Sequence, residues 1–278
     1  MKKWFCLLLV ILTLCLGGCK KEKEEIPENI TFQSQVLMDT EQLYLAVTDI
    51  RETTAEGCVM DLEIRNQTDS NLLFSMGKAA VNGCMCNPYF DESIAAGQTL
   101  TAQAVFDADT LAGYGITKTT VIEFHVSVRD EDSTEECLIE ETFTLYPRGK
   151  AHKHYQTRKP QKTDRVLMDN DTCSIILTAV HDDSFWGYDL GIYLVNKTDR
   201  TLLFTADEAF LNQVACDPYW TTTVLPGKCS NTTMYWFDHD LEDAGITQVN
   251  EISMLVNVSD LADWIKPILS ETVTIDMK

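Results

Sequence analysis

Cysteine has the widest range of chemistry among the residues of this sequence, and it recurs at Cys58, Cys84, Cys86, Cys137, Cys173, Cys216 and Cys229. Thiolates hold zinc or exchange disulfides most often when two of them are spaced as CxxC, with histidines or a second pair at ligand spacing. Cys84 and Cys86 are separated by only one residue, and no histidine follows at ligand spacing. The sequence therefore predicts no metal site and no cofactor.

The remaining titratable residues also lack a catalytic arrangement. The chain contains no Gly-x-Ser-x-Gly, His-Glu-x-x-His or glycine-rich phosphate loop. Its densest acidic segment, 238–243, lacks the spacing of an EF-hand calcium loop. Acidic side chains are also favourable in the first turn of a helix, so we expect a helix start there, with calcium binding as the alternative. We predict that the protein is not an enzyme.

The first residues of the chain have the pattern of an export signal. Lys2 and Lys3 precede an uncharged apolar run from Trp4 to Leu16, whose thirteen residues are too few to cross about 30 Å of hydrocarbon as a helix. A positive start followed by an apolar run of this length is typical of a cleaved leader. The sequence Leu16-Gly17-Gly18-Cys19 comes next.

This tetrapeptide resembles the lipobox of bacterial lipoproteins. The resemblance implies cleavage after residue 18 and attachment of a lipid to the sulfur of Cys19, and acyl chains of this kind hold a protein stably on a membrane. We therefore predict a signal peptide over 1–18, a lipidated tether over 19–32, and a location on the extracytoplasmic face of the bacterial membrane. The alternative is a signal that ends at small residues and is followed by an incidental cysteine.

An offset of 130 residues divides the rest of the chain into two copies. Positions 36–145 match their partners at 29 of 110 ungapped pairs, where chance gives about one in fifteen. We predict two domains, over 33–147 and 166–278, joined by a basic linker over 148–165. The linker is either a solvated spacer, a segment that folds back onto an acidic domain face, or a contact for the membrane or an anionic wall polymer.

Hydrophobic residues alternate with polar ones within each copy. Ile122, Phe124, Val126 and Val128 are separated by polar residues, and 252–258 repeats the pattern, which is typical of strands with one buried face. Such strands, separated by turn residues, predict a β-sandwich.

Turn and cap residues refine this prediction. We expect one short helical turn in each copy, capped by Asp107 and Asp238. Asn82-Gly83 is a hairpin dipeptide. The second copy has Asn212-Gln213 at the matching position, and we expect it to turn differently.

The order of these motifs is similar to a repeated module of uncharacterised bacterial surface lipoproteins. The motifs run Asn-x-Thr-Asp, Leu-Leu-Phe, Val-Asn-Gly, Ala-Gly, Phe-Asp and Leu-x-x-x-Gly-Ile-Thr, and end in an alternating strand. The resemblance implies an all-β fold of two tandem immunoglobulin-like β-sandwich domains. Because its motifs mark turns and core, it leaves the function open.

Aromatic residues distinguish the second copy from the first. Trp220 and Trp236 replace Phe90 and Phe106, so we expect them in the core. With an immunoglobulin-like strand order, the loops near 181–187 and 260–268 lie at the same end. A patch for a ligand would then be formed by Phe185, Trp186, Tyr188 and Trp264. The alternative is that each ring packs over its own loop.

The thiols of an exported protein can form disulfides, but only Cys86 and Cys216 occupy matching positions of the two copies. We therefore expect buried free thiols, with Cys173–Cys229 or Cys58–Cys137 bridges as alternatives.

Charge and composition limit the function. Lys and Arg total 22 against 43 Asp and Glu, so the net charge of −21 excludes a general affinity for nucleic acid. We expect a non-catalytic binding or adhesion module for a protein or glycan ligand. The alternatives are a structural or accessory component of an envelope complex and, last, an enzyme.

Overall fold

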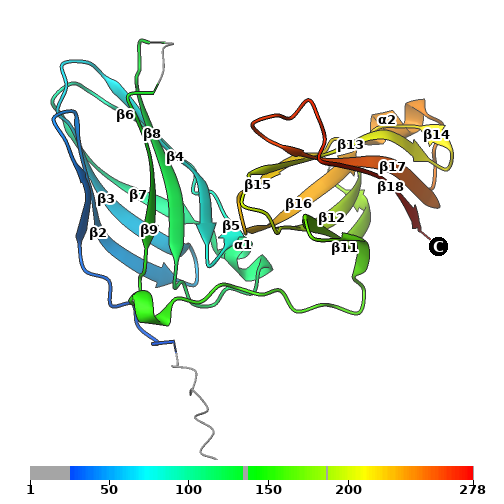
Figure 1. Cartoon of the computed structure of the whole chain (residues 1–278), viewed down its shortest axis with the longest axis horizontal. Helices are drawn as coiled ribbons and strands as arrows, with labels where there is room; N and C mark the ends of the chain where they lie inside the picture. The colour runs from blue at the N-terminus through cyan, green and yellow to red at the C-terminus, as the bar shows by residue number, and fades with distance from the viewer. Residues whose placement is uncertain (1–25, 134–136, 186, 278) are drawn as a thin grey trace, which may run out of the picture.

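The computed structural model describes residues 26–133, 137–185 and 187–277. Its described part is built of antiparallel strands with two short α-helices and one 3-10 turn, which confirms the predicted all-β sandwich class. Figure 1 shows one sandwich made by the first half of the chain beside another made by the second half. Among the described residues, no helix is both long enough and apolar enough to cross a membrane.

The first sandwich has one sheet in the order β1-β2-β3-β7 and a second in the order β5-β4-β8-β9, with β6 paired to β4. Its elements are β1 (Gln35–Asp39), β2 (Leu43–Thr53), β3 (Gly57–Asn66), β4 (Leu72–Val81), β5 (Cys84–Met85), β6 (Phe90–Ile94), β7 (Thr99–Phe106), α1 (Ala108–Gly113), β8 (Ile122–Asp130) and β9 (Ile139–Leu145).

The second sandwich repeats this order with sheets β10-β11-β12-β16 and β14-β13-β17-β18, and β15 pairs with β13. Its elements are β10 (Arg165–Asp169), β11 (Cys173–Ser184), β12 (Gly187–Asn196), β13 (Leu202–Leu211), β14 (Val214–Ala215), β15 (Thr221–Val224), β16 (Cys229–Trp236), α2 (Asp238–Asp243), β17 (Glu251–Asp260) and β18 (Leu269–Asp276). Independent folding over 33–147 and 166–278 stays a prediction.

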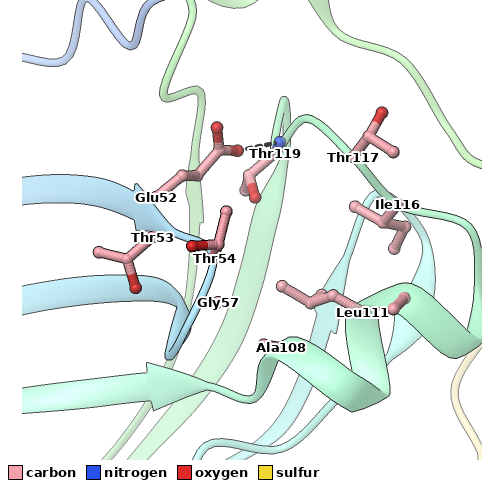
Figure 2. Close-up of a pocket in the computed structure, with 10 residues that line it drawn as sticks. Glu52, Thr53, Thr54, Gly57, Ala108, Leu111, Ile116, Thr117 and Thr119 are labelled. Atoms are coloured by element: carbon pink, nitrogen blue, oxygen red, sulfur yellow. Dashed lines mark hydrogen bonds between the residues drawn. The ribbon is translucent and has the colours of Figure 1, made fainter.

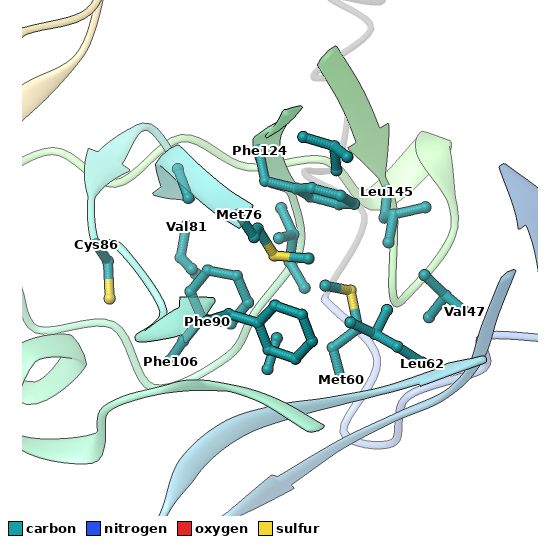
Figure 3. Close-up of a cluster of buried hydrophobic side chains, with 14 of the residues drawn as sticks. Val47, Met60, Leu62, Met76, Val81, Cys86, Phe90, Phe106, Phe124 and Leu145 are labelled. Atoms are coloured by element: carbon teal, nitrogen blue, oxygen red, sulfur yellow. The ribbon is translucent and has the colours of Figure 1, made fainter. Parts of the chain in front are cut away.

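Each sandwich buries its own apolar core, because the alternating residues of facing sheets point inward. In β8, Phe124, Val126 and Val128 are fully buried, whereas the residues between them are not. Figure 3 shows Phe124 packed among inward side chains of the opposite sheet, such as Met60 and Leu62. Burial of one such side chain contributes about 1.5–3 kcal/mol. Trp220 and Trp236 lie in the second core, as predicted.

The duplication extends to irregular features of the backbone. The register of β1 on β2 shifts between Val36 and Met38, and that of β10 on β11 shifts between Val166 and Met168. Bulges of this kind bend a strand locally. The same local geometry at positions 130 residues apart indicates that both copies kept one backbone design.

The turns after β4 and β13 also have the same conformation, which corrects one expectation. Asn82 and Gly83 have φ of 50° and 84°, and Asn212 and Gln213 have φ of 50° and 71°. Gln213 therefore adopts the left-handed conformation that usually requires glycine. Hydrogen bonds of the Asn212 side chain hold the turn. Its amide donates to the Gln248 carbonyl at 2.6 Å, and its oxygen accepts from the backbone N–H groups of Asn250 and Glu251.

The predicted N-cap residue of the short helix is confirmed in the first copy and is wrong in the second. Asp107 caps α1 by accepting from the Thr110 N–H at 2.7 Å. In the second copy the cap position is Phe237, and Asp238 is the first helical residue, so the prediction of Asp238 as the cap is wrong. The acids of this segment still lie in the first turn, where they favour the helix dipole.

A buried asparagine ties the sheets together at the same place in both sandwiches. The Asn66 side-chain amide donates to the carbonyls of Ser70 and Ile94, at 2.7 and 2.9 Å. Asn196 donates to Arg200 and Val224 at the same two distances. Because buried polar groups are costly without partners, these residues satisfy carbonyls that the core would otherwise leave unpaired.

We expect Asn66→Ala and Asn196→Ala to lower the free energy of unfolding by similar amounts, about 1–3 kcal/mol each, because each leaves buried carbonyls without donors. Urea unfolding followed by circular dichroism measures the effect. A large loss from one variant with none from its counterpart would contradict the equivalence of the two sites.

The segment predicted as a basic linker, 148–165, runs along the first sandwich before it reaches β10 (Figure 1), with the 3-10 turn η1 (Lys150–His152) near its start. The His154 N–H donates to the Thr120 hydroxyl at 3.0 Å. Further along, the Arg158 guanidinium lies 5.3 Å from the ring centre of Tyr193 in β12. The segment thus contacts both sandwiches.

Arg148 at the start of this segment is buried in the first sandwich. Its guanidinium pairs with the carboxylate of Glu52 and donates to the Pro27 and Glu28 carbonyls. Arginine suits this position because its fork of donors serves several oxygens at once. The pair fixes the segment before β1 and the end of β2 to the base of the sandwich.

We expect Arg148→Ala to destabilise the protein by about 3 kcal/mol or more, because it leaves the Glu52 carboxylate and two carbonyls without their partner. Chemical unfolding of the full chain measures this. Arg51→Ala is the matched control: it removes a more exposed ion pair with Asp61, so its effect should be small. Equal effects of the two variants would refute the assignment of Arg148 as a structural anchor.

A parallel strand pair joins the two sandwiches. β5 of the first pairs with β16 of the second through Cys84 and Cys229, which makes one nine-stranded sheet. The Cys229 N–H donates to the Gly83 carbonyl at 3.0 Å. Beside this pair, the Tyr114 hydroxyl donates to the Met85 carbonyl at 2.9 Å and accepts from the backbone N–H of Asn231 at 2.7 Å.

Candidate functional site

The structure does not bring together the four residues that the sequence predicts as ligand contacts. Phe185 lies in the turn between β11 and β12, and 91% of its surface is exposed. Tyr188 is buried, with its ring centre 6.0 Å from that of Trp236. Trp264 lies in the loop between β17 and β18 and is 63% exposed. Trp186 lies outside the described residues.

The expectation that the two loops share one end of the sandwich is wrong, because of the strand directions. The turn that contains Phe185 precedes β12, whereas the chain turns into β13 after β12 ends at Asn196. Leu202, the first residue of β13, pairs with Asp260, the last residue of β17. The Trp264 loop therefore lies about 30 Å from Phe185, the length of a ten-residue strand.

A different group of aromatic side chains does gather on the outer face of the second sandwich. We call Tyr219, Tyr235, Phe237 and His239 the aromatic row. Tyr219 and Tyr235 form an antiparallel bridge, and their rings stack with centres 5.5 Å apart and an angle of 11°. Phe237 meets both tyrosines edge-on at 4.8 and 5.2 Å, and His239 stacks on Phe237 at 5.3 Å.

Strand alternation positions this row. Met234 and Trp236 point into the core and are buried, so Tyr235 between them points outward. Trp220 is likewise buried while its neighbour Tyr219 is 46% exposed. Tyr235 is thus placed by a regular strand, Tyr219 by a single bridge to it, and Phe237 and His239 by the start of α2. The buried rings of Trp220 and Trp236 lie beneath the row.

A polar pair extends the same face. Asp189 is the cross-strand partner of Tyr235, and His181 is the cross-strand partner of Asp189. Directly opposed residues in an antiparallel sheet lie on one face. Nδ1 of His181 lies 2.6 Å from Oδ1 of Asp189. Asp189 is only 6% exposed, whereas more than half of the His181 side chain is exposed. The face therefore combines aromatic rings, which offer apolar surface, with an imidazole that offers hydrogen bonds and is held by a buried carboxylate.

The first sandwich has no such row at the matching positions. Val105, Asp107 and Asp109 stand where the second has Tyr235, Phe237 and His239. Only Tyr89, which is fully exposed, matches Tyr219. The aromatic row therefore either arose in the second copy after the duplication or was lost from the first. Such a difference is expected when two copies take on different functions.

The aromatic row was not among the predicted site residues, although the sequence contains a signal for it. Tyr235 and Phe237 are two residues apart and flank a core tryptophan, so both faces of this strand are aromatic. Two features would have indicated the row. Aromatic residues stand at outward-facing positions of an alternating strand, and the matching positions of the other copy are not aromatic.

Each sandwich also has a pocket between a hairpin turn and its helix: the β2–β3 turn and α1 in the first, and the β11–β12 hairpin and α2 in the second. Figure 2 shows the one in the first sandwich, about 240 Å³ in volume, with Leu111 and Ile116 beside threonines and Glu52. The Glu52 carboxylate accepts from the Thr119 N–H and pairs with Arg148. The only acid that lines this pocket among the described residues is thus held by structural partners and does not suit acid–base chemistry.

The described cysteines are all free thiols, but Cys137 is exposed and Cys216 is half-buried, whereas we expected buried thiols. Neither of the two alternative bridges is placed to form. Cys58 is buried in the core whereas Cys137 is exposed. Cys173 and Cys229 lie on β11 and β16, which are separated by β12. The sulfur next to Cys229 is instead that of Cys84, at 3.0 Å.

Within the part of the chain that the structure covers, no three His, Cys, Asp or Glu side chains gather at distances that would hold a metal ion. Cys19, the predicted lipidation site, lies outside the described residues.

Comparison with known proteins gives little further information. No family model matches the chain, and no curated protein matches it in sequence. It is similar in structure to red sea bream transglutaminase, with 9% identity and a TM-score of 0.26 over 86% of this chain and 31% of that one. It is also similar to exo-chitosanase CsxA of Amycolatopsis orientalis, with 11% identity and a TM-score of 0.23 over 84% of this chain and 26% of that one. The chain thus spans at most about a third of either protein, and TM-scores this low support no argument.

Proposed function

We propose that this chain is a lipoprotein, anchored through Cys19 to the extracytoplasmic face of a bacterial membrane, that acts as a non-catalytic binding or adhesion module. The leader pattern of residues 1–18 and the resemblance of 16–19 to a lipobox support the anchor. The resemblance to surface-lipoprotein modules supports an immunoglobulin-like arrangement of each half.

The observation that carries the binding role is the aromatic row. Tyr219, Tyr235 and Phe237 place apolar ring surface next to the exposed imidazole of His181, which the buried carboxylate of Asp189 holds in place. Sugars present an apolar C–H face together with hydroxyl groups, and this combination of groups complements them. A glycan is therefore the ligand class that we favour, with a protein ligand as the alternative.

A second candidate function is a structural or accessory role in an envelope complex. It is favoured by the loop between β17 and β18, where Leu261, Trp264, Ile265 and Ile268 are exposed by 39%, 63%, 79% and 46%. Apolar side chains gathered on one exposed loop are typical of contacts with a protein or a membrane. The two functions place the ligand or partner at opposite ends of the second sandwich, so variants separate them.

The binding role predicts that Tyr219→Ala combined with Phe237→Ala weakens retention on a glycan array or an insoluble polysaccharide by about tenfold or more. Loss of two aromatic contacts, each of about 1 kcal/mol, accounts for this size. Affinity electrophoresis and array binding measure the change.

Tyr89→Ala is the matched control, because Tyr89 occupies the equivalent position of the first sandwich and should not matter. Trp264→Ala should leave glycan retention unchanged and reduce capture of envelope proteins if the second function holds. Unchanged glycan retention by the double variant, with an intact circular dichroism spectrum, would reject the aromatic row as the binding face.

The anchor predicts incorporation of a clickable palmitate analogue by the full-length chain expressed in a bacterium, and its sedimentation with membranes. Cys19→Ala should abolish the label and release the chain from the membrane fraction, because no other residue receives the lipid. Cys15→Ala, four residues earlier in the apolar run, is the control and should keep both. Persistent labelling of Cys19→Ala would be incompatible with the anchor.

A further inference from the structure

The junction between the two sandwiches places two thiols side by side, away from the aromatic row. Cys84 and Cys229 are cross-strand partners in the pairing of β5 with β16, and their sulfur atoms lie 3.0 Å apart. Neighbouring strands are about 4.8 Å apart, which falls within the Cα separation of about 4.4–6.8 Å that a disulfide spans. A movement of about 1 Å brings the sulfurs to bonding distance.

The surroundings give the two thiols different tendencies to ionise. The pKa of Cys229 is lowered because the Cys84 thiol hydrogen-bonds to its sulfur, and Tyr193 and the ammonium of Lys228 add to this effect, although burial opposes it. The pKa of Cys84 is raised by that same hydrogen bond and by burial. Cys229 is therefore the nucleophile of the pair, since thiolates carry out disulfide exchange.

A route to Cys229 exists. A cavity of about 340 Å³ lies between the linker and the second sandwich and is lined by Cys229, Lys228, Tyr193 and Tyr155. Cys229 itself is only 6% exposed, so we expect a small disulfide or the disulfide of an oxidoreductase to reach its sulfur from this side when the linker moves away. By contrast, burial raises the pKa of both Cys58 and Cys86 to about 12.

We propose that Cys84 and Cys229 form a reversible disulfide that fixes the two sandwiches in the arrangement of Figure 1. The oxidant is a second disulfide, carried by a thiol–disulfide oxidoreductase or by a small thiol compound, of the kind found where exported proteins fold.

The exchange takes place in two steps and balances. The Cys229 thiolate attacks one sulfur of the donor disulfide, forms a mixed disulfide, and releases the first donor thiolate. That donor thiolate takes up the proton that Cys229 lost on ionising. The sulfur of Cys84 then attacks Sγ of Cys229, expels the second donor thiolate and passes its own proton to it. One donor disulfide becomes two thiols, and the two protein thiols become one disulfide.

While it is formed, this bond would add a covalent link to a junction that otherwise depends on non-covalent contacts. Lys228 of the second sandwich pairs with Glu123 of the first, and the Leu225 N–H contacts the Met85 sulfur at 3.4 Å. The cysteines are 145 residues apart in sequence, so the disulfide would bridge the two sandwiches independently of the linker.

The test uses the full-length chain, purified in detergent under reducing conditions and then exposed to oxidised glutathione. Free thiols are alkylated at intervals, and peptides are identified by mass spectrometry. We expect a peptide pair linked through Cys84 and Cys229, with loss of these two thiols at least about tenfold faster than loss of Cys58. Cys84→Ser and Cys229→Ser should each abolish the linked pair, whereas Cys86→Ser keeps it.

A second measurement does not depend on cysteine variants. A protease site inserted between Lys162 and Thr163, in the exposed part of the linker, allows the oxidised chain to be cut. The cut chain should migrate as one species on a non-reducing denaturing gel and as two after reduction. Separation without reductant, or recovery of Cys84 and Cys229 only as thiols or as separate glutathione adducts in the folded protein, would overturn the proposal.

Discussion

The edge pairing of β5 with β16 determines how the two halves of this protein are arranged. A strand at the edge of a sheet presents N–H and C=O groups that need partners, and here the edge of each sandwich satisfies the other. Tyr114 supports the pair from the side, with its hydroxyl bonded to the backbone of both halves. The linker then lies along an assembly that is already held by backbone contacts, which explains why it can be long, polar and basic.

The two copies share the residues that pack the core and satisfy buried backbone groups, and they differ in the residues exposed on the outer face. Asn66 and Asn196 make the same hydrogen bonds at the same distances, and the bulges in β1 and β10 recur. On the outer face, by contrast, a valine and acids of the first copy correspond to the aromatic row of the second. Core packing and the hydrogen bonds of buried backbone groups constrain both copies equally, whereas one copy is enough to carry a binding surface.

The sequence pattern predicted the strands and cores because every second residue of a half-buried strand must be apolar. Phe124 and Val126 follow this rule within a few neighbouring positions. It could not predict the junction, since the pairing of Cys84 with Cys229 depends on strand edges 145 residues apart and leaves no periodic signal. The predicted patch of Phe185 and Trp264 failed as a geometric prediction because the two loops follow strand ends on opposite sides of the sandwich, and residue types do not specify these strand directions. Gln213 shows a third limit, since surrounding hydrogen bonds impose a turn that its residue type disfavours.

The junction also bears on self-association, because it is head-to-tail: the β5 side of one unit meets the β16 edge of the next. Repetition of such a contact between molecules produces open filaments. The residues that make it occur only once, however. Val214, Ala215 and Ala244 stand where the first unit has Cys84, Met85 and Tyr114, and Thr99 stands where the second has Cys229. The outer ends therefore lack the residues that make this contact, so the junction as built does not provide for the addition of a third unit.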